Sequence, residues 1–163
     1  MEAELKRVFG YSSLRGLQAE VINEVLDGRD AFAIMPTGAG KSLCYQLPGI
    51  MAKDKVAIVI TPLLALMLEQ VATLNTRGVP AGALYSTQGK KNRNSVMNDL
   101  FGRVGDGAEE GKPLISLLYV TPELMCNSAF QSELLRLSSS KAISLFAGAS
   151  VFFLLCPSIN PMP

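Results

Sequence analysis

The segment Met35-Pro36-Thr37-Gly38-Ala39-Gly40-Lys41-Ser42 decides the fold, because it joins a short apolar run to a helix-like run through a glycine-rich turn. The apolar run is Ala31-Phe32-Ala33-Ile34, and the helix-like run extends from Leu43 to Ala52. A strand, a glycine-rich turn and a helix are the context of a phosphate-binding P-loop. The general pattern G-x-x-x-x-G-K-[ST] is met except at its first position, which is Met35. The alternative is an ordinary glycine turn with a solvated Lys41.

Each residue of this segment has a predicted role if it is a P-loop. The small residues from Thr37 to Gly40 would let backbone N–H groups close around phosphate oxygens, beside the favourable field of a helix N-terminus. Lys41 would reach the outer phosphates, and the Ser42 hydroxyl would hold Mg²⁺. The predicted phosphate-binding residues are Thr37, Gly38, Ala39, Gly40, Lys41 and Ser42, with Ser42 also as the metal ligand.

Composition narrows the class of protein. The chain has 163 residues, of which 48% are hydrophobic and 18% charged, as expected of one folded α/β domain. The net charge of +1 does not by itself indicate a nucleic-acid partner. Only residues 86–94 are locally basic, and a run of that size is usually a solvated loop or helix start.

Cysteine and histidine usage exclude several kinds of site. The three cysteines are far apart and the chain contains no histidine. A structural zinc site, a disulfide framework and a histidine-assisted nucleophile are therefore disfavoured, and we expect a reducing, intracellular compartment. The charged N-terminus is not a signal peptide. The apolar stretch 143–156 is too short and interrupted for a membrane anchor, which remains a minor alternative.

Strands and helices are predicted to alternate along the chain. Val56 to Ile60 is a continuous apolar run rich in β-branched residues, typical of a strand buried on both faces. Such alternation favours a parallel sheet with crossover helices on both faces, in three layers and one domain. The other predicted strands are 31–34, 81–85, 114–120 and 141–147; the predicted helices are 17–26, 43–52, 61–75, 94–104 and 121–137, with a loop at 105–113.

The segment upstream of the P-loop carries a further motif. It reads Phe9-Gly10-Tyr11-Ser12-Ser13-Leu14-Arg15-Gly16-Leu17-Gln18-Ala19-Glu20-Val21-Ile22. It resembles the adenine-recognition motif F-G-Y-x-x-F-R-x-x-Q-x-x-x-I of the RecQ family of superfamily 2 DNA helicases, with Leu14 in place of the aromatic residue. The resemblance implies that Tyr11 and Arg15 frame the nucleotide and that Gln18 binds the adenine edge, as an amide can.

Three more segments resemble RecQ motifs in the family order, and the resemblance spans roughly residues 5–147. They are 35–48, which includes the Cys-Tyr-Gln-Leu-Pro tail of the P-loop, 61–71 and 119–123. The family implies a RecA-like fold, the cofactors ATP and Mg²⁺, a role in DNA recombination and repair, and nuclear localisation in a eukaryote. It also implies that two strand-to-helix corners contact single-stranded DNA or DNA junctions through phosphates. The residues at these corners are Thr61, Pro62, Leu63, Thr121, Pro122 and Glu123.

The resemblance ends one strand short of the acidic pair that an ATPase of this class needs. No acidic residue follows Glu133, and the strand beginning at 143 runs into Gly148-Ala149-Ser150 instead of Asp-Glu-Ala-His. We expect residues 1–147 to be the incomplete ATP-binding lobe of a 3′–5′ DNA helicase, and residues 148–163 to be a divergent apolar tail. A truncated or alternatively spliced product would explain this divergence.

Three functions follow from these observations. The first is the ATP-binding lobe just described, with weak ATP·Mg binding, little hydrolysis and no unwinding by this chain alone. The second is a non-catalytic module that binds ATP or single-stranded DNA as a competitor. The third is another P-loop phosphotransferase, although no arginine-rich lid segment follows the P-loop. For the tail, residues 151–155 are expected to extend the last strand. No protein partner is predicted.

Overall fold

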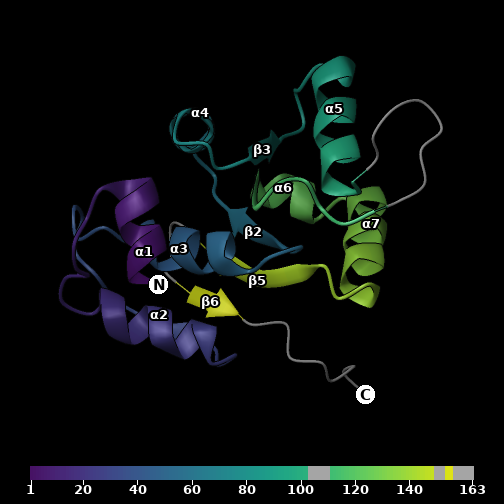
Figure 1. Cartoon of the computed structure of the whole chain (residues 1–163). Coiled ribbons are helices and arrows are strands. Elements are labelled where there is room, and N and C mark those ends of the chain that lie inside the picture. Colours follow the sequence, from purple (N-terminus) through teal and green to yellow (C-terminus); the bar gives the residue numbers. More distant parts are fainter. Residues whose placement is uncertain (103–110, 149–152, 156–163) are drawn as a thin grey trace.

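The computed structural model describes residues 1–102, 111–148 and 153–155, and they form an α/β fold around a six-stranded sheet (Figure 1). The strand order is β1-β6-β5-β2-β4-β3. β2, β3, β4 and β5 are parallel, whereas β6 is antiparallel to both of its neighbours. The strands are β1 (Ala31–Phe32), β2 (Val56–Ile60), β3 (Ala81–Leu84), β4 (Leu117–Val120), β5 (Ile143–Gly148) and β6 (Phe153–Leu155).

Helices cover both faces of this sheet. One apolar cluster joins η1, α2, α3 and α4 to the sheet, and a second joins α5, α6 and α7 to its other face. Figure 1 shows these two groups on opposite sides of the strands. The expected three layers are therefore present. The helices are α1 (Glu2–Glu4), the π-helical turn η1 (Leu5–Phe9), α2 (Gln18–Leu26), α3 (Leu43–Met51), α4 (Leu64–Thr76), α5 (Lys90–Leu100), α6 (Pro122–Met125) and α7 (Ser128–Ser139).

The central strand β2 has the predicted bounds, and its side chains explain why. Ala57 and Val59 pack into the first cluster, while Val56 and Ile58 pack into the second, as the alternation of a strand requires. All four are fully buried. At the carboxyl end, Ile60 is opposite Val120 of β4 and Gly148 of β5, so the segments that follow these strands leave one edge of the sheet.

The expectation that residues 151–155 extend the last strand is wrong for the residues that the structure describes. Phe153–Leu155 is a separate strand that runs between β5 and β1 and pairs with both. The sheet is consequently mixed and not wholly parallel. Two observations account for this placement: β6 supplies hydrogen-bonding partners to β1 and β5, and Leu154 is fully buried in the first cluster. Residues 151 and 152 lie outside the described residues.

Several element bounds also differ from those predicted. The predicted strand 31–34 keeps only two residues as β1. The predicted helix 94–104 begins earlier, at Lys90, and ends at Leu100; positions 103 and 104 lie outside the described residues. Most of the predicted loop 105–113 lies outside them too, and the strand expected from residue 114 begins at Leu117. Most of these differences fall at element ends, where packing is weakest.

The two Thr-Pro corners start their helices differently. The helix expected to open at Thr61-Pro62 begins at Leu64, after extended backbone at Leu63. At the other corner Thr121 is the N-cap and Pro122 the first helical residue. The single helix expected over 121–137 is two helices, because Asn127 begins a new one: its Oδ1 accepts a hydrogen bond from the Phe130 N–H at 3.1 Å.

Membrane insertion by a helix is not supported in the part of the chain that the structure describes, where every helix is too short or too polar to cross a bilayer.

Candidate functional site

The P-loop connects β1 to α3, and several of its residues line one pocket. Gly38 and Gly40 have φ angles of 82° and 75°, which glycine adopts without strain. Within the described part of the chain, the N–H groups of Gly38, Gly40, Lys41 and Ser42 donate to no backbone carbonyl. Unpaired donors converging at the start of a helix form an anion-binding cradle. These N–H groups are therefore free of backbone acceptors, and their role toward phosphate stays a prediction.

The two side chains at the end of the loop lie at the start of α3. The Lys41 ammonium donates to the carbonyl oxygens of Met35 at 3.1 Å and Pro36 at 3.2 Å. A phosphate would compete with these two neutral acceptors for the ammonium, and a charged acceptor forms the stronger hydrogen bond. Ser42 is the N-cap of α3 and makes no side-chain cap hydrogen bond to the helix backbone; its side chain is instead hydrogen-bonded with Tyr45.

Gln18 joins the upstream motif to the P-loop. Its Nε2 donates to the carbonyl oxygens of Ala39 at 3.0 Å and Gly40 at 3.3 Å, and its Oε1 accepts from the Arg15 N–H at 2.8 Å. The side chain is 5% exposed. The predicted adenine reader therefore lies against the loop that would bind the phosphates, and its amide is engaged with that loop. Its role toward adenine stays a prediction.

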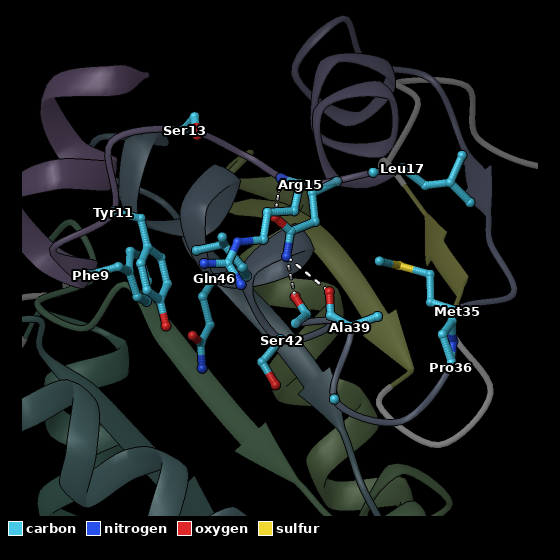
Figure 2. A pocket seen from close by; sticks show the side chains of 15 residues that line it. Phe9, Tyr11, Ser13, Arg15, Leu17, Met35, Pro36, Ala39, Ser42 and Gln46 are labelled. Carbon is cyan, nitrogen blue, oxygen red and sulfur yellow. Dashed lines mark hydrogen bonds between the residues drawn. The ribbon is translucent and has the colours of Figure 1, made fainter.

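A pocket of about 640 Å³ lies between the upstream motif and the P-loop. Tyr11 and Arg15 both line it, and Tyr11 is half exposed; that they frame a nucleotide stays a prediction. Thr37 is exposed and does not line it. Figure 2 shows the lining side chains around this space. They come from Phe9, Tyr11, Ser13, Arg15, Gly16, Leu17, Gln18, Met35, Pro36, Gly38, Ala39, Gly40, Ser42, Leu43 and Gln46.

The residues present fit a nucleotide better than they fit an all-protein metal site. The pocket volume, the unpaired N–H groups and Lys41 suit a phosphorylated ligand. Among the described residues no group of three or more His, Cys, Asp or Glu side chains could hold a metal ion. Mg²⁺ would thus depend on the Ser42 hydroxyl, on phosphate oxygens and on water, which is a combination that this ion accepts.

The two corners predicted to contact DNA lie next to each other at the carboxyl ends of β2 and β4. The Thr61 N–H donates to the Val120 carbonyl at 3.0 Å. The hydroxyls of Thr61 and Thr121 are buried and have no hydrogen-bond partner among the described residues. The exposed residues at the corners are Pro62, Leu63 and Glu123, with Pro122 half-buried. Contact between these corners and a nucleic acid stays a prediction.

Gln46 is a pocket residue that the sequence did not single out. It lies one turn into α3, is 6% exposed and lines the pocket. Its Nε2 donates to Gln70 Oε1 at 2.5 Å and to the Tyr119 hydroxyl at 2.9 Å. Two sequence features could have marked it: its place in the Cys-Tyr-Gln-Leu-Pro tail of the P-loop motif, and its amide within an otherwise apolar helix, 43–51.

Two tyrosines below the pocket are neutral hydrogen-bonding groups. Burial raises the pKa of Tyr119 well above the ordinary range of a phenol. Burial also raises the pKa of Tyr45, and hydrogen bonding with Ser42 and Tyr119 partly opposes that rise. Their rings meet edge to face, with centroids 6.4 Å apart. Both hydroxyls therefore remain protonated at neutral pH and can donate as well as accept.

Known proteins resemble this chain over most of its length. The DEAD/DEAH box helicase family model matches residues 15–144. ATP-dependent DNA helicase Q5 of Rattus norvegicus is 40% identical over 146 residues, which cover 88% of this chain and 14% of the relative. ATP-dependent DNA helicase RecQ of Haemophilus influenzae is 45% identical over 128 residues, covering 78% and 19%. ATP-dependent DNA helicase Q-like 2 of Arabidopsis thaliana is 40% identical over 141 residues, covering 86% and 19%. The chain thus spans less than a fifth of the length of these relatives.

Proposed function

Because the chain belongs to the DEAD/DEAH box helicase family, with RecQ helicases as its relatives, we propose that it is the ATP-binding lobe of a RecQ-like DNA helicase. Membership of this family implies the use of ATP. The observation that carries the proposal is the contact between Gln18 and the P-loop, because Gln18 and Ala39 stand 21 residues apart in two separate motifs and meet at one pocket.

The roles within the pocket follow from its chemistry. The N–H groups of Gly38, Gly40 and Lys41 and the Lys41 ammonium would bind phosphate oxygens, while Ser42 would contribute to Mg²⁺ binding. Tyr11 and Arg15 would flank the base. ATP supplies the phosphoryl group whose transfer drives a helicase. The chain's own residues bind and orient that group, and no acidic residue after Glu133 is present to orient an attacking water.

Nucleotide titration of the Lys41→Ala variant tests the proposal. Loss of a charge-assisted hydrogen bond costs about 1.5–3 kcal/mol, so the Kd for a fluorescent ATP analogue with Mg²⁺ should rise at least ~10-fold. Lys55→Ala is the matched control, because Lys55 is exposed and does not line the pocket. Equal affinity of the Lys41→Ala variant and the wild type would contradict the proposal.

A second candidate function, that of a non-catalytic binding module, is favoured because the sequence has no acidic residue after Glu133. Without a carboxylate there, the chain is suited to bind ATP and single-stranded DNA without turnover, and so to act as a non-catalytic module. Contact with DNA through the Thr61–Leu63 and Thr121–Glu123 corners would depend on phosphates, so the affinity for an oligothymidylate should fall steeply with added salt. ATP hydrolysis or strand separation by the purified chain would contradict this second function.

A further inference from the structure

A buried polar cluster connects the pocket to the two corners. It consists of Gln46 on α3, Gln70 on α4 and Tyr119 on β4. Gln46 donates one Nε2 hydrogen to Gln70 Oε1 at 2.5 Å and the other to the Tyr119 hydroxyl at 2.9 Å. Tyr119 is 1% exposed and Gln70 is partly buried. Both N–H bonds of the Gln46 amide are therefore used between elements, and none remains for water.

Such a cluster favours one arrangement of the elements that carry it. An amide without partners is costly in an apolar interior, and here the partners stand on three different elements. If α3 moved relative to α4 or β4, a buried donor or acceptor would lose its partner. This cluster therefore fixes the positions of α3, α4 and β4 relative to one another.

Each of the three elements also begins or ends at a candidate binding segment. α3 continues the P-loop, and the Gln46 N–H donates to the Ser42 carbonyl at 2.9 Å. α4 follows the Thr61–Leu63 corner, and Tyr119 precedes Thr121 by two residues in the chain. The Gln46 side chain lines the pocket as well. A displacement of Ser42 by a bound phosphate would move Gln46, and with it the partners that fix both corners.

We propose that Gln46 is a positioning residue that couples the nucleotide pocket to single-stranded DNA bound at the α4 and β4 corners. This inference rests on the proposed function, because it requires both ligands to bind. Coupling between two sites is reciprocal. The factor by which nucleotide changes the Kd for DNA must therefore equal the factor by which DNA changes the Kd for nucleotide.

The experiment measures this coupling factor in variants that leave the pocket intact. A non-hydrolysable fluorescent ATP analogue with Mg²⁺ is titrated with and without saturating oligothymidylate, and the oligothymidylate is titrated with and without the analogue. We expect a factor of roughly 5 or more in the wild type. In Gln70→Leu the factor should fall to about 1, whereas the nucleotide Kd without DNA changes less than about twofold.

Further variants separate positioning from simple destabilisation. Gln70→Glu keeps an acceptor for Gln46 Nε2 and should retain the coupling factor, although its charge weakens DNA binding. Tyr119→Phe keeps the ring and removes the hydroxyl, so it should reduce coupling even if Gln70→Leu does not fold. Gln131→Leu is the matched control, since the exposed Gln131 amide donates to the Met125 carbonyl on α6 and not to the cluster.

A second contact between the end of α4 and the pocket could carry the coupling in place of the Gln46 cluster. The Arg77 guanidinium lies 5.5 Å from the centroid of the Phe9 ring, and Phe9 lines the pocket. Loss of coupling in Arg77→Gln but not in Gln70→Leu would overturn the inference. A wild-type coupling factor of 1 with both ligands bound would overturn the inference alone. Failure of the wild type to bind the nucleotide would overturn the proposed function and this inference with it.

Discussion

At the scale of single residues, Gly40 is constrained both by its backbone and by its neighbour. Its φ is 75°, and a Cβ added there would collide with Gln18 Nε2, which two carbonyl groups hold in place. Gly40→Ala should displace Gln18 and lower the affinity for an ATP analogue at least ~10-fold.

Gly28→Ala is the control for Gly40→Ala. Gly28 has a similar φ of 78°, but a Cβ there would meet open space. It should cost about 1–2 kcal/mol of folding free energy through the backbone alone and leave nucleotide affinity unchanged. Both variants are titrated with the ATP analogue and unfolded with urea. Equal losses of nucleotide affinity in the two variants would contradict the role given to Gln18.

Because of Cys44, the free energy of unfolding should vary with pH in the alkaline range. Burial raises the pKa of its thiol from 9.0 to about 11. Between these values the unfolded chain has lost the proton while the folded chain retains it, so the free energy of unfolding must fall as pH rises. Cys44→Ala should remove part of this fall.

Urea midpoints of the wild type and Cys44→Ala between about pH 8 and pH 10 measure the effect. The variant loses packing at every pH, and the informative quantity is the slope against pH. The exposed Cys126 supplies the control Cys126→Ala, which should keep the wild-type slope. Parallel curves for wild type and Cys44→Ala would contradict the prediction.

The site residues that the sequence predicts are those whose chemistry is tied to a motif. Lys41, Ser42 and Gln18 stand in such motifs. The structure places Gln18 and Ser42 in the wall of one pocket, whereas the Lys41 ammonium contacts the carbonyls of Met35 and Pro36. The sequence did not identify Gln46, because the partners of that amide are 24 and 73 residues away and no local pattern encodes them. Nor could it foresee that the Thr61 hydroxyl is buried, because side-chain direction at a corner depends on packing across the sheet.

At the scale of elements, the two N-caps of α6 and α7 differ in their chemistry. Asn127 accepts a hydrogen bond from the Phe130 N–H, whereas Thr121 makes no side-chain cap hydrogen bond. Asn127→Ala should therefore cost about 0.5–2 kcal/mol of folding free energy. Thr121→Val, which replaces an unpartnered buried hydroxyl by a methyl group, should be neutral within about 0.5 kcal/mol or stabilising. Urea unfolding of both variants compares them, and an equal loss would contradict the assignment of the caps.

Element bounds could be predicted where both faces of a segment are buried. β2 agrees residue for residue, since every position from Val56 to Val59 is fully buried and the flanking residues are polar. α5 could not be delimited because its first residues, from Lys90 to Asn92, are exposed and have no apolar periodicity to mark them. The break between α6 and α7 depends on a single cap at Asn127, which competes with a continuous helix by only a small free energy.

At the scale of the whole molecule, β6 completes the sheet between β5 and β1. Leu154 is fully buried in the cluster that includes α2 and α3, while Leu155 is 44% exposed. Leu154→Ala should cost about 2–5 kcal/mol of folding free energy, and Leu155→Ala less than about 1 kcal/mol. Urea unfolding of the two neighbouring variants tests whether β6 belongs to the core, and similar small losses would contradict it.

The overall architecture was predictable, but the direction of its last strand was not. Alternating strands and helices imply three layers, because each crossover helix must cover a sheet face. The sequence 151–155 has the apolar, β-rich composition of a strand whichever way it runs. Its antiparallel placement depends on the two partner strands, β1 and β5, which lie more than 100 residues apart in the chain.

The position of β6 has a consequence for the motion of the P-loop. β1 pairs with β6 alone among the described strands, over two residue positions, Ala31 opposite Leu154 and Phe32 opposite Phe153. Such a short ladder at the sheet margin opens more readily than the interior strands do. Amide hydrogens of β1 and β6 should therefore exchange with deuterium faster than those of β2 and β4. β1, which precedes the P-loop, would then unfold locally together with β6, and the pairing between these two strands would set how often β1 opens.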